Sequence, residues 1–139
     1  MSRITISYRR SDSAGITGRI YDRLTAHFGG GSVFMDVDTI PFGVDFRKYV
    51  DDALERTDFL LVVIGSHWLG PRAEGGNRIH DGNDPVRMEI AAGLRNGVTT
   101  VIPLLIDGAS MPTPAMLPKE LRPLSHRNAA EISSASVAT

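Results

Sequence analysis

The run Phe-Leu-Leu-Val-Val-Ile at positions 59–64 decides the fold. An unbroken apolar run rich in β-branched and aromatic residues is typical of a parallel strand that is buried on both faces. We therefore expect residues 59–64 to form the central strand of a sheet. The run is too short to cross a bilayer, which takes about 20 apolar residues.

Strand and helix patterns alternate on both sides of this run. Further strands are expected at residues 3–7, 33–35, 98–106 and 128–132, and helices at residues 16–28, from about residue 45, and at 85–97. Asp84 and Pro85 have the residue types of a helix N-cap and first helical position. This alternation predicts a single α/β domain with an open parallel sheet of order 2-1-3-4-5 and helices on both faces.

The composition excludes several classes of functional site and partner. The chain has 139 residues, no cysteine, and 15 basic against 16 acidic residues, which gives a net charge of −1. The lack of cysteine excludes disulfides, zinc-thiolate sites and thiol nucleophiles. The balanced charge provides no general attraction to nucleic acid or to an anionic membrane. Because the N-terminus lacks the apolar core of a signal peptide, we expect a cytoplasmic protein.

Motifs of several enzyme classes are missing. The chain has no Gly-Lys-Ser/Thr, no G-x-G-x-x-G after the first strand and no G-x-S-x-G, which disfavours a P-loop nucleotidase, a dinucleotide fingerprint and a serine hydrolase. Its four histidines lack metal-ligand spacing, so no metal site is expected. Asp36 and Asp38 would suit a receiver-like phosphoacceptor, but that site needs carboxylates after strands 1 and 3, where Tyr8-Arg9-Arg10 and Gly65-Ser66 stand.

Glu89 is the most informative carboxylate. At about 100° per residue it borders the apolar stripe of the third helix, near the sheet edge where ligands bind in this topology. A carboxylate that is partly desolvated needs a compensating partner. The alternative is an acid that only complements the helix dipole. For Arg9 and Arg10 the alternative to a functional role is that they are only solvated charges after a strand.

Four blocks of sequence carry a family resemblance. They are Ile-Thr-Ile-Ser-Tyr-Arg-Arg-Ser-Asp at 4–12, Val-Phe-Met-Asp-Val-Asp-Thr-Ile-Pro-Phe-Gly at 33–43, Phe-Leu-Leu-Val-Val-Ile-Gly at 59–65 and Asp-Pro-Val-Arg-Met-Glu-Ile at 84–90. In this order and spacing they resemble a TIR (Toll/interleukin-1 receptor) domain of the bacterial type, over residues 1 to about 130. The resemblance implies a flavodoxin-like fold, with residues 131–139 as a tail, either truncated or a linker to a missing segment.

The resemblance also implies an activity. Catalytic TIR domains cleave NAD between nicotinamide and ribose with one glutamate, which matches Glu89, and give ADP-ribose or a cyclic product. By the same match Tyr8, Arg9 and Asp36 would surround the nucleotide, and Trp68 would form a wall of the pocket unless it is a half-buried anchor. NAD is then a substrate, and no cofactor is required.

The resemblance further implies assembly. The segment 36–44 looks like the BB loop through which TIR domains associate, and the residues expected to make the contact are Ile40, Pro41, Phe42, Gly43 and Val44. The expected partners are therefore NAD and other TIR domains, including copies of this chain, in bacterial immunity or signalling. The alternative function is a non-catalytic interaction module.

Two positions depart from the family pattern. Several catalytic relatives carry tryptophan four residues before the glutamate, where this chain has Pro85. The C-terminal helix expected after the last strand has no counterpart in residues 133–139, because that segment is short and not amphipathic.

Overall fold

Strand β3 (Phe59–Ile64) is the centre of the sheet, as its apolar run predicts. The structure is a computed structural model that describes residues 2–35 and 42–137. Its other strands are β1 (Ile4–Ser7), β2 (Val33–Met35), β4 (Thr100–Ile106) and β5 (Ala130–Ile132). All four pairings are parallel, and the order β2-β1-β3-β4-β5 confirms the predicted topology.

Strand β4 begins two residues later than the sequence pattern suggests. The side-chain oxygen of Asn96 accepts hydrogen bonds from the backbone N–H groups of Val98 and Thr99, at 2.9 and 3.0 Å. These bonds close a turn after the third helix. Residues 98 and 99 therefore belong to the turn rather than to the sheet.

The helices are α1 (Arg10–Phe28), α2 (Phe46–Glu55), α3 (Pro85–Arg95) and the single turn α4 (Ser134–Val137). Helix α1 starts before residue 16 because the carbonyl of Arg9 accepts the N–H groups of Asp12 and Ser13, which forms an extra turn with a kink at Ser13. It ends at Gly29 (φ +95°), as the glycines predict. The expectation of no helix in residues 133–139 is wrong by this one turn, α4.

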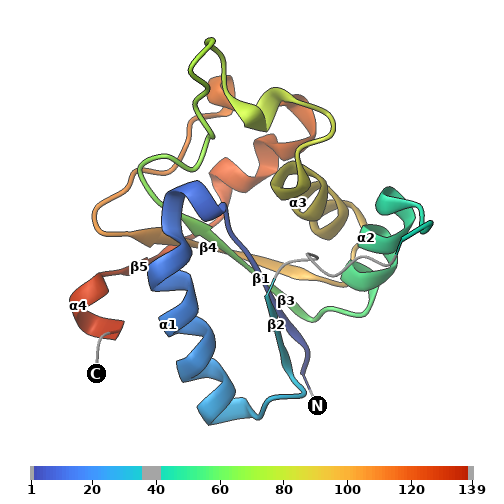
Figure 1. The fold of residues 1–139 in the computed structure, drawn as a ribbon, viewed down its shortest axis with the longest axis vertical. Helices are drawn as coiled ribbons and strands as arrows, with labels where there is room; N and C mark the ends of the chain where they lie inside the picture. The colour runs from blue at the N-terminus through green and yellow to red at the C-terminus, as the bar shows by residue number, and fades with distance from the viewer. Residues whose placement is uncertain (1, 36–41, 138–139) are drawn as a thin grey trace.

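Helices cover both faces of the sheet. Figure 1 shows α1 and α4 on one side and α2, α3 and the 3₁₀ segment Lys119–His126 on the other. Each face has its own apolar core: Ile6, Ile16 and Val63 are buried on the α1 face, and Leu54, Leu60 and Ile90 on the α3 face. No helix of the described residues is long and apolar enough to span a membrane.

The 3₁₀ segment Lys119–His126 takes the place of a regular helix between β4 and β5. Sequence analysis did not predict it, because the prolines of this region indicate only loops. Pro123 lies inside the segment and has no N–H to donate, which disfavours an α-helix there. Leu121 and Leu124 are nevertheless fully buried, so the segment completes the core of the α3 face.

Candidate active site

Glu89 lies inside the protein at the end of β1. It is on the second turn of α3, only 1% exposed, and its Oε1 accepts a hydrogen bond of 2.9 Å from the hydroxyl of Ser7, the last residue of β1. The position is therefore deeper than the helix-wheel expectation, which placed Glu89 at the border of the stripe. Since a buried carboxylate is costly without hydrogen bonds, Ser7 contributes to holding it there.

Arg9 and Asp84 form a buried ion pair between the end of β1 and the start of α3. The guanidinium nitrogens Nη1 and Nη2 donate to the two Asp84 oxygens at 2.9 and 2.7 Å, and Nε donates to the carbonyl of Trp68 at 2.7 Å. Arg9 is 2% and Asp84 3% exposed. The alternative of Arg9 as a solvated charge is therefore wrong.

Asp84 occupies the N-cap position of α3 without capping it through its side chain. The expected N-cap position and Pro85 at the start of the helix are confirmed, but the carboxylate binds Arg9 instead of the first backbone N–H groups. A guanidinium matches both oxygens of a carboxylate at once, and this two-pronged pairing prevails over capping here. The pair fixes the start of α3, five residues before Glu89, to the end of β1.

Gly70 allows the segment after β3 to pass close to Arg9. Its φ is +76°, and a Cβ atom built on it would lie 2.9 Å from Arg9 Cζ and 2.8 Å from the Cβ of Arg78. Both the left-handed backbone and the lack of space require glycine. The buried guanidinium is thus covered directly by main chain.

Asp12 fixes the beginning of the same segment. Its two carboxylate oxygens accept the backbone N–H groups of Gly65 and His67, at 2.8 and 2.7 Å. A Cβ on Gly65 would lie 2.6 Å from Asp12 Oδ1, so this contact also depends on glycine. Asp12, Gly65 and Gly70 together hold the loop that follows the central strand against the ends of β1 and α1.

The two aromatic residues expected at the nucleotide are both buried. Tyr8 is in the core of the α1 face with Ile6 and Ile16, whereas Trp68 is 1% exposed in the core of the α3 face. The alternative interpretation of Trp68 as a half-buried anchor is wrong in one respect, because the side chain is fully buried. The structure thus brings Arg9 to the Trp68 main chain, and it places Tyr8 on the other side of the sheet. Contact of either ring with a nucleotide stays a prediction.

The predicted self-association loop lies partly outside the described residues, which do not include Asp36, Ile40 and Pro41. Of its remaining residues, Phe42 is fully exposed and Val44 is 44% exposed. Gly43 has a φ of +81°, a conformation that favours glycine. A fully exposed phenylalanine next to an exposed valine places apolar surface directly before α2.

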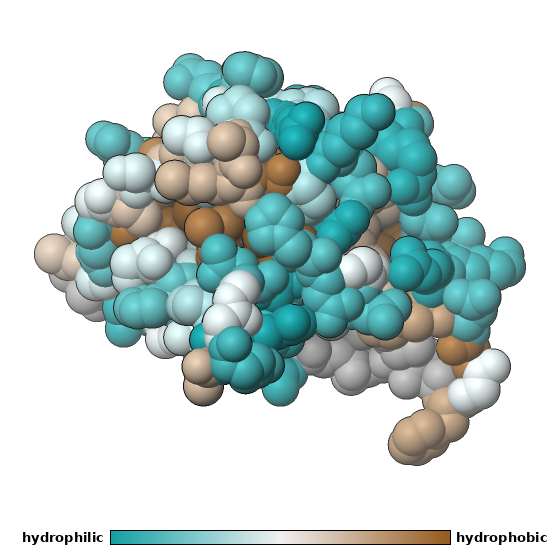
Figure 2. Space-filling model, turned by 90° about the horizontal axis from the view of Figure 1, so that it is seen from above, coloured by the Kyte–Doolittle hydropathy of each residue, from teal (hydrophilic) through white to brown (hydrophobic). Residues whose placement is uncertain are grey.

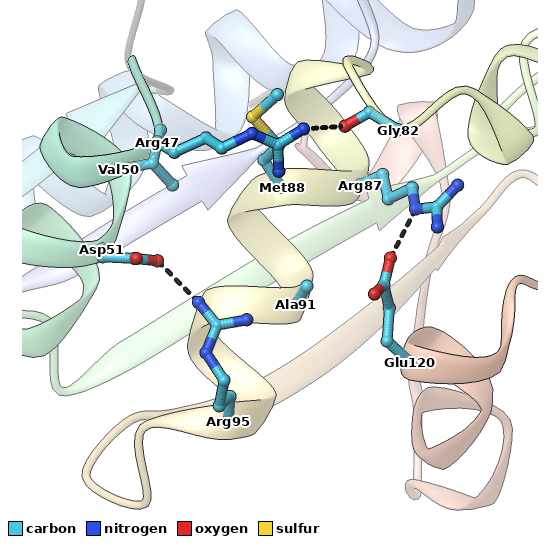
Figure 3. Close-up of a pocket in the computed structure, with 9 residues that line it drawn as sticks. All are labelled: Arg47, Val50, Asp51, Gly82, Arg87, Met88, Ala91, Arg95 and Glu120. Carbon is cyan, nitrogen blue, oxygen red and sulfur yellow. Dashed lines mark hydrogen bonds and ion pairs between the residues drawn. The ribbon is translucent and has the colours of Figure 1, made fainter. Parts of the chain in front are cut away.

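The outer face of α3 carries charged pairs instead of a buried acid. It lines a cleft of about 110 Å³ between α2 and the segment Lys119–His126. Figure 3 shows three arginines around its rim, each pointing to a partner: Arg47 to the Gly82 carbonyl, Arg87 to Glu120 and Arg95 to Asp51. Each guanidinium is already bound. These contacts hold α3 and the loop before it against α2 and the segment Lys119–His126.

The face above the carboxyl ends of the strands is mostly hydrophilic. Figure 2 views the molecule from above, the side on which Figure 1 shows the green segment that follows β3, and apolar residues form only a smaller patch among polar ones. Within the described part of the chain, no group of three or more His, Cys, Asp or Glu side chains could hold a metal ion.

Sequence reasoning missed Ser7, Asp12 and the pairing role of Asp84. The only local signal was that Ser7 ends the first strand and Arg9 follows it, at the expected site. Their partners are 82 and 75 residues away along the chain. Pairing of that kind follows from the packing of α3 against β1.

A family model described as the TIR domain matches residues 4–137. Among solved structures, the chain is similar to the TIR domains of the activated Roq1 resistosome that directly recognises the pathogen effector XopQ, with 12% identity and a TM-score of 0.67 over 95% of this chain and 88% of that chain. At this identity the likeness concerns the fold. No curated protein sequence matched the chain.

Proposed function

Since the chain belongs to the TIR domain family, we propose that it is an NAD hydrolase that cleaves the bond between nicotinamide and ribose. The observation that carries the proposal is the position of Glu89, a carboxylate held by the Ser7 hydroxyl at the carboxyl edge of the sheet. Open parallel sheets bind their ligands at this edge, next to the strand where the order reverses, which here is β1.

One carboxylate is sufficient for this reaction. Most glycosidases use two carboxyl groups, one of which protonates the leaving oxygen. The nicotinamide of NAD carries a positive charge, so when its bond to C1′ of the ribose breaks, it takes the bonding electrons and departs as a neutral molecule. The ribose becomes an oxocarbenium-like cation, which an ionised Glu89 stabilises electrostatically. Water then adds to C1′ and releases a proton, giving ADP-ribose, or an internal nucleophile gives a cyclic product.

In this proposal the neighbouring residues hold Glu89 in its position. The Arg9–Asp84 pair holds the start of α3, and Ser7 orients one carboxylate oxygen. A direct contact of Arg9 with a phosphate of NAD would require it to release part of its bonding to Asp84. We propose Tyr8, Asp36 and Trp68 as nucleotide contacts from the family resemblance alone.

Burial of Glu89 supports activation by self-association. At 1% exposure, its carboxylate cannot reach a ribose without a rearrangement of the site. We infer that contact between copies, through the loop that includes Phe42, supplies the energy for this opening. The similar solved structure contains the TIR domains of an activated resistosome, and by analogy we place this chain in an immune or signalling response.

The test measures nicotinamide release from NAD by the purified chain over a range of protein concentrations. Glu89→Gln keeps an acceptor for the Ser7 hydroxyl but removes the charge, and we expect it to abolish release while circular dichroism and melting temperature stay close to wild type. The matched control is Glu131→Gln, the same change at an exposed glutamate of β5, which should leave release unchanged. Equal release by Glu89→Gln and wild type would refute the role of Glu89.

A second candidate function is a non-catalytic interaction module. The full exposure of Phe42, two residues before the exposed Val44, favours it, because contact with a partner would remove this apolar surface from water. Under this function Glu89 serves only the fold. Concentrated wild-type protein that forms large assemblies by light scattering but releases no nicotinamide would favour the module, and Phe42→Ala should then disperse those assemblies.

A further inference from the structure

A second cavity lies along the edge strand β2 and has a volume of about 490 Å³. Its polar walls are Arg3, which directly precedes β1, Tyr21 of α1, and Tyr49 and Arg56 at the α2 side. Glu89 and the Arg9–Asp84 pair are not among the described residues that line it. Arg3 precedes Ser7 by four residues, about 13 Å along a strand at roughly 3.3 Å per residue. The cavity is thus distinct from the candidate active site.

No carboxylate of the described residues binds the side chain of Arg3 in this cavity. Its guanidinium carbon lies 3.8 Å from the centre of the Phe34 ring, and its Nε is buried with no hydrogen-bond partner among residues 2–35 and 42–137. The Asp58 carboxylate is close by but binds the backbone N–H of Arg3, at 2.8 Å. The positive charge of the side chain is therefore not neutralised by that acid.

Arg56 adds a second positive charge to the same cavity. It directly follows α2, and no ion pair joins it to another side chain in the described part of the chain. Partial burial lowers the pKa of the Arg3 guanidinium, and the repulsion from Arg56 lowers it further. An anion between the two guanidiniums would relieve this repulsion.

The arginines of the cleft on the outer face of α3 are bound differently. There, Arg87 and Arg95 each bind a carboxylate and Arg47 binds a carbonyl. Among the described residues that line the larger cavity, Arg3 and Arg56 are accompanied by tyrosines and by no acid. No hydrogen bond within the described residues occupies the side chain of either arginine.

We propose that this cavity is a second ligand site, which binds the phosphate group of a phosphate ester such as a nucleotide. Guanidiniums bind phosphate oxygens through paired, charge-assisted hydrogen bonds, and arginine is the residue best suited to that geometry. The organic part of the ligand lies against Tyr21 and Tyr49. A volume of about 490 Å³ is within the range of sites for small organic ligands, roughly 300–1,000 Å³.

Calorimetric titration of the whole chain tests the site, in a phosphate-free buffer of low ionic strength. The probes are inorganic pyrophosphate, AMP and adenosine. We expect saturable binding of pyrophosphate and AMP, and binding at least about tenfold weaker in Arg56→Gln, because one charged partner of the phosphate is lost. Arg122→Gln is the matched control, an exposed arginine that does not line the cavity, and should bind as wild type does.

A second measurement needs no ligand. Arg56→Gln removes the repulsion on Arg3, so its melting temperature in the absence of anions should exceed that of wild type. If AMP binds more tightly than pyrophosphate, the ligand is a nucleotide. If the two bind equally, the phosphate group alone is sufficient for binding. The proposal is overturned if wild type binds neither phosphate probe, if adenosine binds as tightly as AMP, or if Arg56→Gln binds pyrophosphate as wild type does. None of these results depends on NAD cleavage.

Discussion

Arg9 and Asp84, 75 residues apart in the sequence, meet in a two-pronged ion pair of 2.9 and 2.7 Å in the interior of the protein. The pair joins the residue after Ser7-Tyr8 to the N-cap of α3. Because Glu89 follows on the next turn of that helix, the ion pair controls where the buried carboxylate lies relative to β1.

Asp84→Asn should strongly destabilise the protein. It leaves the Arg9 guanidinium buried without its counter-charge, and the loss of one partner of a buried pair costs about 3–5 kcal/mol. The control is Asp51→Asn, which breaks the exposed ion pair with Arg95 and should cost less than about 1 kcal/mol. Urea unfolding of both variants measures the difference, and equal midpoints would contradict a structural role for the buried pair.

Gly70→Ala should destabilise the protein by more than a typical surface substitution. The new Cβ would lie 2.9 Å from Arg9 Cζ, on a backbone with φ +76°. Strain of that kind costs on the order of 1–3 kcal/mol. Gly82→Ala is the control because nothing lies within 4 Å of its added Cβ and its φ is not positive. Thermal unfolding measures the two melting temperatures, and an equal decrease in both variants would rule out close packing at Gly70.

Ser7→Ala should lower both stability and any NAD cleavage. It removes the hydroxyl that donates to Glu89 Oε1, and a hydrogen bond to a charged group contributes about 1.5–3 kcal/mol. Ser13→Ala is a buried serine control, with a longer contact of 3.3 Å to Thr17. A double-mutant cycle with Glu89→Ala, which removes the acceptor, measures the coupling of Ser7 to Glu89, and strictly additive effects on the free energy of unfolding would argue against it.

Acid should release α4 before the rest of the fold. Asp107 accepts the Ser134 hydroxyl at 2.6 Å and its backbone N–H at 2.7 Å, and these bonds lower the pKa of the Asp107 carboxyl. Because the pKa is lowered, the stability that these bonds add is fully present above the pKa of the unfolded state, about 3.9. It is lost as the pH falls through the pKa of the folded state. Amide exchange at Ser134 should accelerate, relative to the intrinsic rate, below about pH 4. Asp107→Asn should remove this pH dependence.

Much of the fold followed from local pattern. The run at 59–64, the glycine stop at Gly29 and the start of α3 at Pro85 each depend on short-range properties: burial of a continuous apolar strand, a backbone conformation that glycine tolerates, and the fixed φ of proline. The 3₁₀ segment Lys119–His126 did not follow, because its prolines indicate loops while its packing depends on Leu121 and Leu124 reaching the core.

The sequence by itself determined the α/β class and the strand order, and it singled out Glu89 near the apolar stripe of α3, since periodicity and residue type record which faces are buried. Tertiary structure alone decided that Glu89 binds Ser7, that Asp84 pairs with Arg9 rather than capping its own helix, and that Arg3 and Arg56 share a cavity. These contacts join residues more than 50 positions apart in the chain. Their strength depends on burial and on distances of a few ångströms, which arise only when the helices pack on the sheet.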